Sequence, residues 1–74
     1  MRVERLVAMT NDIAAFFGGE PDKAEAARGV ASHLKRFWDP RMRRQILEHY
    51  GKGGHGLDDV ARSGVALLAQ ETQY

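Results

Sequence analysis

Apolar side chains recur every three or four residues along most of this chain, a spacing that predicts helices and not strands. Over residues 3–17 they form a stripe about half the helix circumference wide, broader than the usual stripe of roughly 100°. Its members are Val3, Leu6, Met9, Ile13, Phe16 and Phe17, with Val7 and Ala14 at the margin. One neighbouring helix could not cover this face. Gly18-Gly19 then ends the helix, since glycine readily takes the left-handed conformation found there.

A second helix is predicted over residues 22–38. Asp22 and Glu25 have the spacing of a capping box, with Asp in place of Ser or Thr. The apolar stripe that follows consists of Ala27, Val30, Ala31, Leu34, Phe37 and Trp38. Because Phe37 and Trp38 continue this stripe, both aromatic rings are expected in the core.

Asp39-Pro40 is the sharpest break in the sequence. The residue before a proline is pushed out of helical geometry. Aspartate is nevertheless a good N-cap, and proline is favoured at the first position of a helix. We therefore predict a short third helix over residues 40–50, turning sharply from the second.

The remainder of the chain holds a loop and one further helix. The Gly-rich segment 51–56 is predicted to be a flexible loop. A fourth helix is predicted over residues 58–69, capped by Asp58, and residues 70–74 form a polar tail that we expect to fray. Its core face would comprise Leu57, Ala61, Gly64, Val65 and Leu68. The chain is thus predicted to be one all-α domain over residues 1–74, a small compact bundle of three to four helices.

Length and composition narrow the possible functions. A chain of 74 residues buries a smaller share of its surface than larger domains do, and usually needs a disulfide, a metal or a partner for extra stability. It contains no cysteine, so a partner is the leading candidate. We find neither a membrane span nor a signal peptide, and expect a cytoplasmic protein without membrane contact.

Catalytic and metal sites find little support. The carboxylates are spread over helix caps and exposed faces, and Ser32 and Ser63 lack the context of a nucleophile. His33, His49 and His55 show no i, i+4 pairing typical of a helical zinc site. The Gly-rich loop lacks the pattern of a phosphate-binding loop. We expect no active site and no bound metal or cofactor.

The charge is unevenly distributed. The net charge is +1, but residues 28–52 carry seven Lys/Arg against two acidic residues, a local net charge of +5. Such a segment could bind phosphates weakly and in a salt-dependent manner. A small basic helical nucleic-acid-binding domain is therefore the alternative interpretation. It is disfavoured because Asp39-Pro40 is a poor turn for a helix-turn-helix motif and base-reading Asn or Gln side chains are nearly absent there.

Arg43 stands out within this basic stretch. On the predicted third helix it falls inside the apolar face, between the directions of Ile46 and Leu47. A core arginine is costly unless an acceptor meets its guanidinium. Either Arg43 extends past its neighbours to solvent, or a partner supplies the acceptor; the sequence leaves both open.

The stretch Arg36-Phe37-Trp38-Asp39-Pro40-Arg41-Met42-Arg43-Arg44 resembles the delta subunit of cytosolic NAD-dependent formate dehydrogenases. Three other stretches agree in register. They are Leu6-Val7-Ala8-Met9 with Asn11-Asp12-Ile13-Ala14-Ala15-Phe16-Phe17, Gly29-Val30-Ala31-Ser32-His33-Leu34, and the Gly-rich loop leading to Leu57. The resemblance therefore spans almost the whole chain.

The resemblance implies a non-catalytic accessory subunit that carries no redox group. In this family the large catalytic subunit holds a molybdenum or tungsten bis-pterin guanine dinucleotide cofactor and iron–sulfur clusters. Smaller subunits with FMN and clusters pass electrons to NAD. The delta subunit is implied to stabilise the complex and to support cofactor insertion. This agrees with the cysteine-free composition, since iron–sulfur clusters are bound by thiolates.

We hypothesise that the second and third helices dock on the large subunit. Phe37 and Trp38 would anchor the contact, Pro40 would fix the turn, and the arginines would pair with carboxylates. The candidate partner-binding residues are Phe37, Trp38, Pro40, Arg41, Met42, Arg43 and Arg44. A second hypothesis brings the basic surface against the phosphates of the pterin dinucleotide during its insertion.

Overall fold

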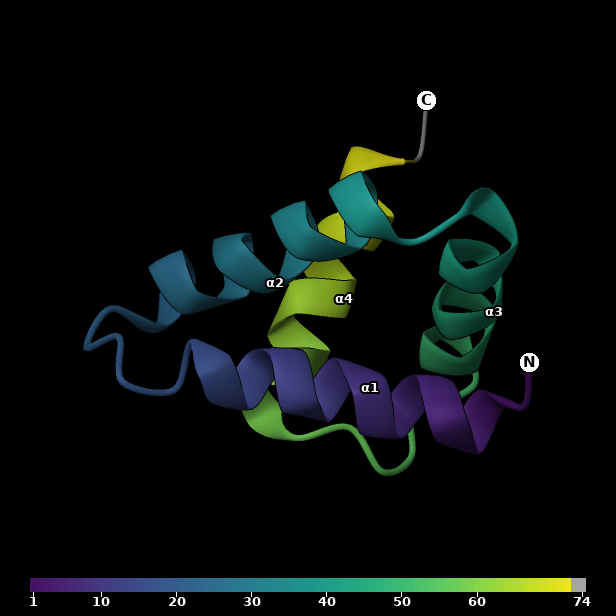
Figure 1. Cartoon of the computed structure of the whole chain (residues 1–74), viewed down its shortest axis with the longest axis horizontal. Coiled ribbons are helices and arrows are strands. Elements are labelled where there is room, and N and C mark those ends of the chain that lie inside the picture. Colours follow the sequence, from purple (N-terminus) through teal and green to yellow (C-terminus); the bar gives the residue numbers. More distant parts are fainter. Residues whose placement is uncertain (73–74) are drawn as a thin grey trace.

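The computed structural model describes residues 1–72, which contain four helices. These are α1 (Val3–Phe16), α2 (Lys23–Phe37), α3 (Pro40–Gly51) and α4 (Asp59–Glu71). In Figure 1, α1, α2 and α3 follow one another like three sides of a frame, and α4 passes behind α1 and α2. The most extensive helix contact joins α2 to α4. The predicted all-α bundle is therefore confirmed.

The break between α2 and α3 has the predicted chemistry. Trp38 leaves the helical conformation, with φ −88° and ψ 142°, and so ends α2. Asp39 caps α3, because its Oδ1 accepts a hydrogen bond from the backbone N–H of Met42 at 2.9 Å. Pro40 occupies the first turn of α3, where no intrahelical N–H partner is lost. These local signals place the turn without help from the rest of the fold.

The start of α2 is capped somewhat differently from the prediction. Asp22 Oδ1 accepts from the backbone N–H groups of Ala24 and Glu25, at 3.0 and 3.4 Å. The reciprocal bond of a capping box is made by another residue, because the N–H of Asp22 donates to Glu20 Oε1 at 3.1 Å. Glu25 instead pairs with Arg28 one turn along α2. Asp22 is thus the cap, while Glu25 is not part of a capping box.

The core lies where the four helices face one another. Leu6, Val30, Leu34, Ile46, Ala61, Val65 and Leu68 are completely or almost completely buried, together with Trp38 and Leu57. Thr10 is the buried polar side chain of α1, and its hydroxyl donates to the carbonyl of Leu6 at 2.7 Å. At Gly64, α4 approaches α2 more closely than any larger residue would permit. The predicted core face of α4 is therefore confirmed.

Two phenylalanines predicted to lie in the core are exposed. Phe16 is 84% exposed and Phe37 is 69% exposed. The buried side of α1 is centred on Leu6, Thr10 and Ala14, which places Phe16 at its edge. Phe37 lies in the last turn of α2, where α1 and α2 have diverged (Figure 1), so that α1 does not cover its ring. The core prediction is wrong for both residues.

The segment between α3 and α4, for which a flexible loop is predicted, makes several hydrogen bonds to the helices around it. Gly51 still belongs to α3. Gly53, Gly54 and Gly56 have positive φ angles of 117°, 63° and 92°, a conformation that glycine adopts without strain. A backbone bond from the N–H of Gly54 to the carbonyl of His49, at 2.9 Å, closes the turn after α3.

Side chains from three helices hold this loop. Asn11 of α1 donates to the carbonyl of Gly56 and accepts from the N–H of Asp58, both at 2.9 Å. Arg62 of α4 donates to the carbonyls of Gly53 and Gly54 at 2.8 and 2.9 Å. His49 Nε2 lies 2.7 Å from the carbonyl oxygen of His55. Asp58 precedes α4 as predicted, but its side chain makes no capping hydrogen bond.

Helix α4 continues further than predicted. Gln70 and Glu71 are helical, and the hydroxyl of Thr72 donates to the carbonyl of Leu68 at 3.0 Å. Part of the segment predicted to fray is thus helical in the structure, and its residues 73–74 lie outside the described part of the chain. No helix within residues 1–72 combines the length and apolarity that crossing a bilayer requires.

Candidate docking surface

The turn between α2 and α3 divides the predicted binding residues into an inner and an outer set. Trp38 is only 5% exposed and belongs to the hydrophobic core, where Met42 packs against the same cluster. Neither side chain is available as an anchor for a partner. The predicted binding role of these two residues is therefore not supported by their placement, and their contribution is to the fold.

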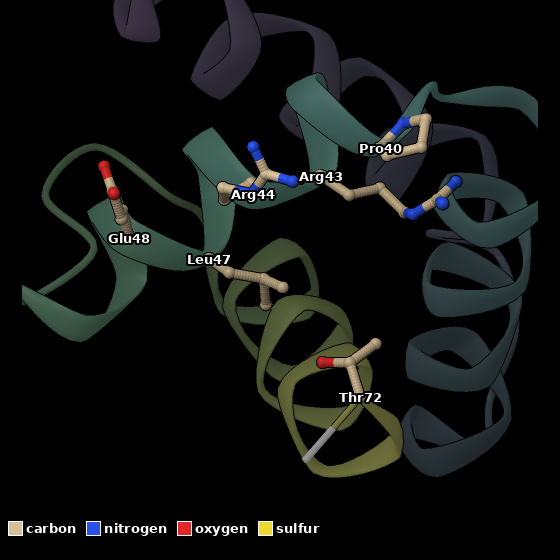
Figure 2. A pocket seen from close by; sticks show the side chains of 6 residues that line it. All are labelled: Pro40, Arg43, Arg44, Leu47, Glu48 and Thr72. Atoms are coloured by element: carbon tan, nitrogen blue, oxygen red, sulfur yellow. The ribbon is translucent and has the colours of Figure 1, made fainter. Parts of the chain in front are cut away.

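Arg43 also faces inward, with acceptors in its own chain. Its Nη1 donates to the backbone carbonyls of Trp38 and of Lys35, the latter at 3.2 Å. Figure 2 shows the guanidinium extending from α3 toward α2. The carbonyls at a helix C-terminus lack intrahelical partners and carry partial negative charge, which makes them good acceptors for a cation. Neither alternative drawn from the sequence describes Arg43, which caps the end of α2.

The outer set forms one exposed surface, which we call the turn surface. It consists of Arg36, Phe37, Pro40, Arg41 and Arg44, and all five residues are exposed. The Cζ atom of Arg36 lies 5.9 Å from the centre of the Phe37 ring, at the limit of a cation–π contact. The sequence analysis did not select Arg36 as a binding residue. Its position beside an aromatic residue in the last turn of α2 was the available signal.

The turn surface is hollowed on both sides of Arg44. One hollow is lined by Asp39, Pro40, Arg41 and Arg44. The other lies between α3 and the end of α4 (Figure 2) and is lined by Pro40, Arg43, Arg44, Leu47, Glu48 and Thr72. In that view Leu47 points toward α4, and Arg44 projects from α3 away from it. The hollow next to α4 has a mainly apolar lining that includes Leu47, whereas the hollow at Asp39 is mainly polar.

The cations of the turn surface are not neutralised by the described part of the chain. Ion pairs within residues 1–72 join Arg2 to Glu4, Arg28 to Glu25, and Lys35 to Glu71. In this range no carboxylate lies within ion-pairing distance of Arg36, Arg41 or Arg44. An exposed phenylalanine beside Arg36, followed along the chain by the exposed cations Arg41 and Arg44, is suited to binding an apolar group and carboxylates.

The three histidines show no arrangement for metal binding or catalysis. Within residues 1–72, no group of three or more His, Cys, Asp or Glu side chains is placed to hold a metal ion. The ring of His33 lies 4.8 Å from that of Phe37, and His49 contacts the backbone of His55. His33 and His49 therefore both make contacts within the fold.

Comparison with known proteins identifies the class of this chain. The family model of the NADH-dependent formate dehydrogenase delta subunit FdsD matches residues 5–65, so the chain belongs to this family of formate dehydrogenase subunits. The matched region contains most of α1, all of α2 and α3 and the first half of α4, including the entire turn surface. Comparison with curated proteins and with solved structures found no match.

Proposed function

We propose that this chain is a non-catalytic accessory subunit that docks through its turn surface on the large catalytic subunit of a formate dehydrogenase. Membership in the delta-subunit family implies partner subunits. The observation that carries the proposal is Phe37, a large apolar ring that is 69% exposed beside Arg36. A chain this small buries only a modest share of its surface, so an uncovered ring of this size is costly for its stability. Aromatic and arginine side chains are the residue types that dominate interface energetics.

The chemistry of the turn surface defines what the partner has to present. Phe37 requires an apolar pocket, and the guanidinium groups of Arg36, Arg41 and Arg44 require carboxylates, with which they form two parallel hydrogen bonds. Such pairs strengthen when the surrounding interface excludes water. The large subunit is therefore expected to offer an apolar pocket with an acidic rim.

The redox chemistry is proposed to reside in the partner subunits. Iron–sulfur clusters are held by thiolates, and this chain has no cysteine. A molybdenum or tungsten bis-pterin guanine dinucleotide, FMN and NAD would likewise be bound by other subunits of a cytoplasmic complex. The contribution of this chain would be the stability of the complex.

A direct test is co-expression of the tagged chain with the formate dehydrogenase subunits of its source, followed by affinity purification and an assay of formate-dependent NAD reduction. The wild-type chain is expected to recover the large subunit and the activity. The double variant Arg41→Ala, Arg44→Ala is expected to lose most of this recovery. Arg5→Ala with Lys23→Ala removes the same charge from exposed positions outside the turn surface and is expected to retain it. Equal recovery with both double variants would refute docking through the turn surface.

Support of cofactor insertion is a further part of the proposal. The hollows beside Arg44 contain the cationic side chains that phosphate groups of a pterin dinucleotide would require. The large subunit should then contain less metal and less pterin when it is produced without this chain. Full loading in its absence would limit the role of the chain to structural support.

Nucleic-acid binding is less compatible with the observed placement of the cations. Of the seven basic residues in the segment 28–52, Arg43 caps α2, while Arg28 and Lys35 are in ion pairs. Fewer cations are therefore free to replace the counterions of a phosphate backbone. Retardation of DNA or RNA by the purified chain, weakening steeply with added salt, would favour this alternative.

A further inference from the structure

A second exposed apolar feature lies where the end of α1 faces α2, and we call it the aromatic groove. It is lined by Asp12, Ile13, Phe16, Phe17 and His33. Phe16 is 84% exposed and meets Phe17 edge to face, with ring centres 5.3 Å apart and an interplanar angle of 89°. The groove is therefore an apolar surface with one carboxylate and one imidazole among its lining side chains.

The floor of the groove depends on a glycine. A Cβ added to Gly29 of α2 would lie 2.5 Å from Cε1 of Phe17, closer than real Cβ contacts permit. The absence of a side chain at Gly29 allows the Phe17 ring to lie directly against the backbone of α2. This holds the Phe17 ring in place, and Phe16, beside it, remains directed toward solvent.

The aromatic groove is continuous with the turn surface. His33 lines the groove, and its ring lies 4.8 Å from the ring of Phe37. Phe37 is in turn covered on one side by Arg36. The aromatic groove is therefore linked through His33 to Phe37 and Arg36, the two residues of the turn surface that lie on α2.

We infer that the aromatic groove receives an apolar side chain of the same large subunit and extends the docking interface onto α1. This inference rests on the proposed function of the turn surface. It adds Phe16, Phe17 and His33, on the far side of Phe37, to the residues that contact the partner.

Area and charge argue for the large subunit as occupant in preference to a second copy of the chain. A phenylalanine ring offers about 150–250 Å², so the exposed fractions of Phe16 and Phe37 together supply about 300 Å². A stable dimer buries about 800 Å² on each partner. Two copies facing each other across Phe16 and Phe37 would also bring their Arg36 side chains toward each other, which like-charge repulsion opposes. A larger subunit can cover the groove together with the turn surface and so bury more area, and carboxylates on it would pair with Arg36.

The absence of cysteine provides a clean test. The variant Phe16→Cys introduces the only thiol of the chain, and Ser63→Cys places one at an exposed position of α4 as a matched control. Each variant is labelled with a maleimide, both as the free chain and in the purified complex with the large subunit. Intact-mass measurement of the small chain then gives its labelling rate, regardless of cysteines in the other subunits.

The thiol at position 16 is expected to react about tenfold or more slowly in the complex than in the free chain, because the interface has to open before the reagent enters. The control thiol is expected to react at similar rates in both. In parallel, Phe16→Ala is expected to weaken binding of the large subunit by about tenfold, as truncation of an interface anchor does. Its effect on the thermal unfolding of the free chain should be small, because Phe16 contributes little to the core.

Other outcomes would overturn the inference. If the complex forms and the thiol at position 16 reacts as fast as in the free chain, docking through the turn surface stands and the groove lies outside the interface. If labelling slows with the concentration of the free chain itself, the occupant is a second copy. If the wild-type chain does not recover the large subunit at all, the proposed function fails together with this inference.

Discussion

Gly64 of α4 lies directly against Val30 of α2, with no space for a side chain between them. A Cβ added to Gly64 would come within 2.4 Å of Cγ1 and 2.5 Å of Cβ of Val30, and 3.3 Å from the carbonyl oxygen of Ala27. Because Val30 is β-branched and completely buried, it cannot rotate away without disturbing the core. This contact determines how closely the two most extensively packed helices approach.

Gly64→Ala is therefore expected to lower the free energy of unfolding by about 1–3 kcal/mol through overpacking, although alanine is the better helix former. Gly51→Ala is the matched control, since a Cβ at Gly51 meets nothing within 4 Å. The control is expected to leave stability unchanged or to raise it by up to about 1 kcal/mol. Urea unfolding followed by circular dichroism measures both. Equal stability of the two variants would mean that α2 and α4 separate easily.

The neighbouring residues Phe37 and Trp38 are expected to respond in opposite ways to truncation. Trp38→Ala removes a buried ring and should cost about 3–5 kcal/mol, enough to unfold much of an isolated domain of this size. Phe37→Ala removes an exposed ring and should change stability by about 0.5 kcal/mol or less. Thermal melts by circular dichroism distinguish the two. The Phe37→Ala chain should stay folded and yet bind the large subunit poorly.

Arg43 and Arg44 provide a second pair of neighbours with separate roles. Arg43→Met removes the donors to the carbonyls of Lys35 and Trp38 and should cost about 1–3 kcal/mol. Arg44→Met removes an exposed cation and should change stability by about 0.5 kcal/mol or less. Trp38 is the only tryptophan, so its fluorescence reports urea unfolding of both variants directly.

A second substitution, Arg43→Lys, distinguishes the effect of the positive charge of Arg43 from the effect of its guanidinium geometry. Arg43→Lys keeps the positive charge near the end of α2 but loses the planar guanidinium that reaches two carbonyls at once. Its stability should lie between those of the wild type and Arg43→Met. If Arg43→Met were as stable as Arg44→Met, the helix-capping role assigned to Arg43 would be wrong.

Asn11 is expected to control the order of the Gly-rich loop. Asn11→Ala removes both hydrogen bonds to the loop, and at about 0.5–1.5 kcal/mol for each bond it should cost about 1–3 kcal/mol. The measurable consequence is local. The backbone N–H of Asp58, which donates to Asn11 Oδ1 in the wild type, should exchange its hydrogen faster. Asp12→Ala, at an exposed neighbouring position, is the control and should leave this exchange rate unchanged.

Local sequence signals were sufficient to locate the helices. Asp22, Asp39 and Pro40 act through contacts within three residues, and this chemistry can be recognised without knowing the fold. The apolar periodicity of α4 likewise identified Gly64 and Val65 as core positions, because a helix surrounded by others buries its entire apolar stripe.

The errors concern features that depend on where other helices lie. Periodicity gives the direction of Phe16 and Phe37 on their helices, but not whether a neighbour reaches that far along the axis. It placed Arg43 on the inner face correctly and could not show that the end of α2 supplies carbonyl acceptors there. The sequence also could not show the hydrogen bond between Asn11 and the loop, because Asn11 lies 45 residues away from Gly56.

The sequence predicted where the candidate surface lies, but only some of the residues that are exposed on it. The resemblance identified the segment around the turn, and Phe37, Pro40, Arg41 and Arg44 are indeed exposed there. Trp38 turns into the core because it is the first residue to leave the helix, a change of backbone direction that helical periodicity does not describe.

The packing of α4, the last helix, against the other three has a consequence for biosynthesis. A ribosome that has made α1, α2 and α3 has released three amphipathic helices without the helix that covers them, since Ala61, Val65 and Leu68 are still to be added. The apolar sides of these helices stay uncovered until translation has passed Leu68, so the nascent chain cannot complete its fold segment by segment. Folding then takes place in one late step, in which a chaperone or the partner subunit can meet the chain before its core has closed.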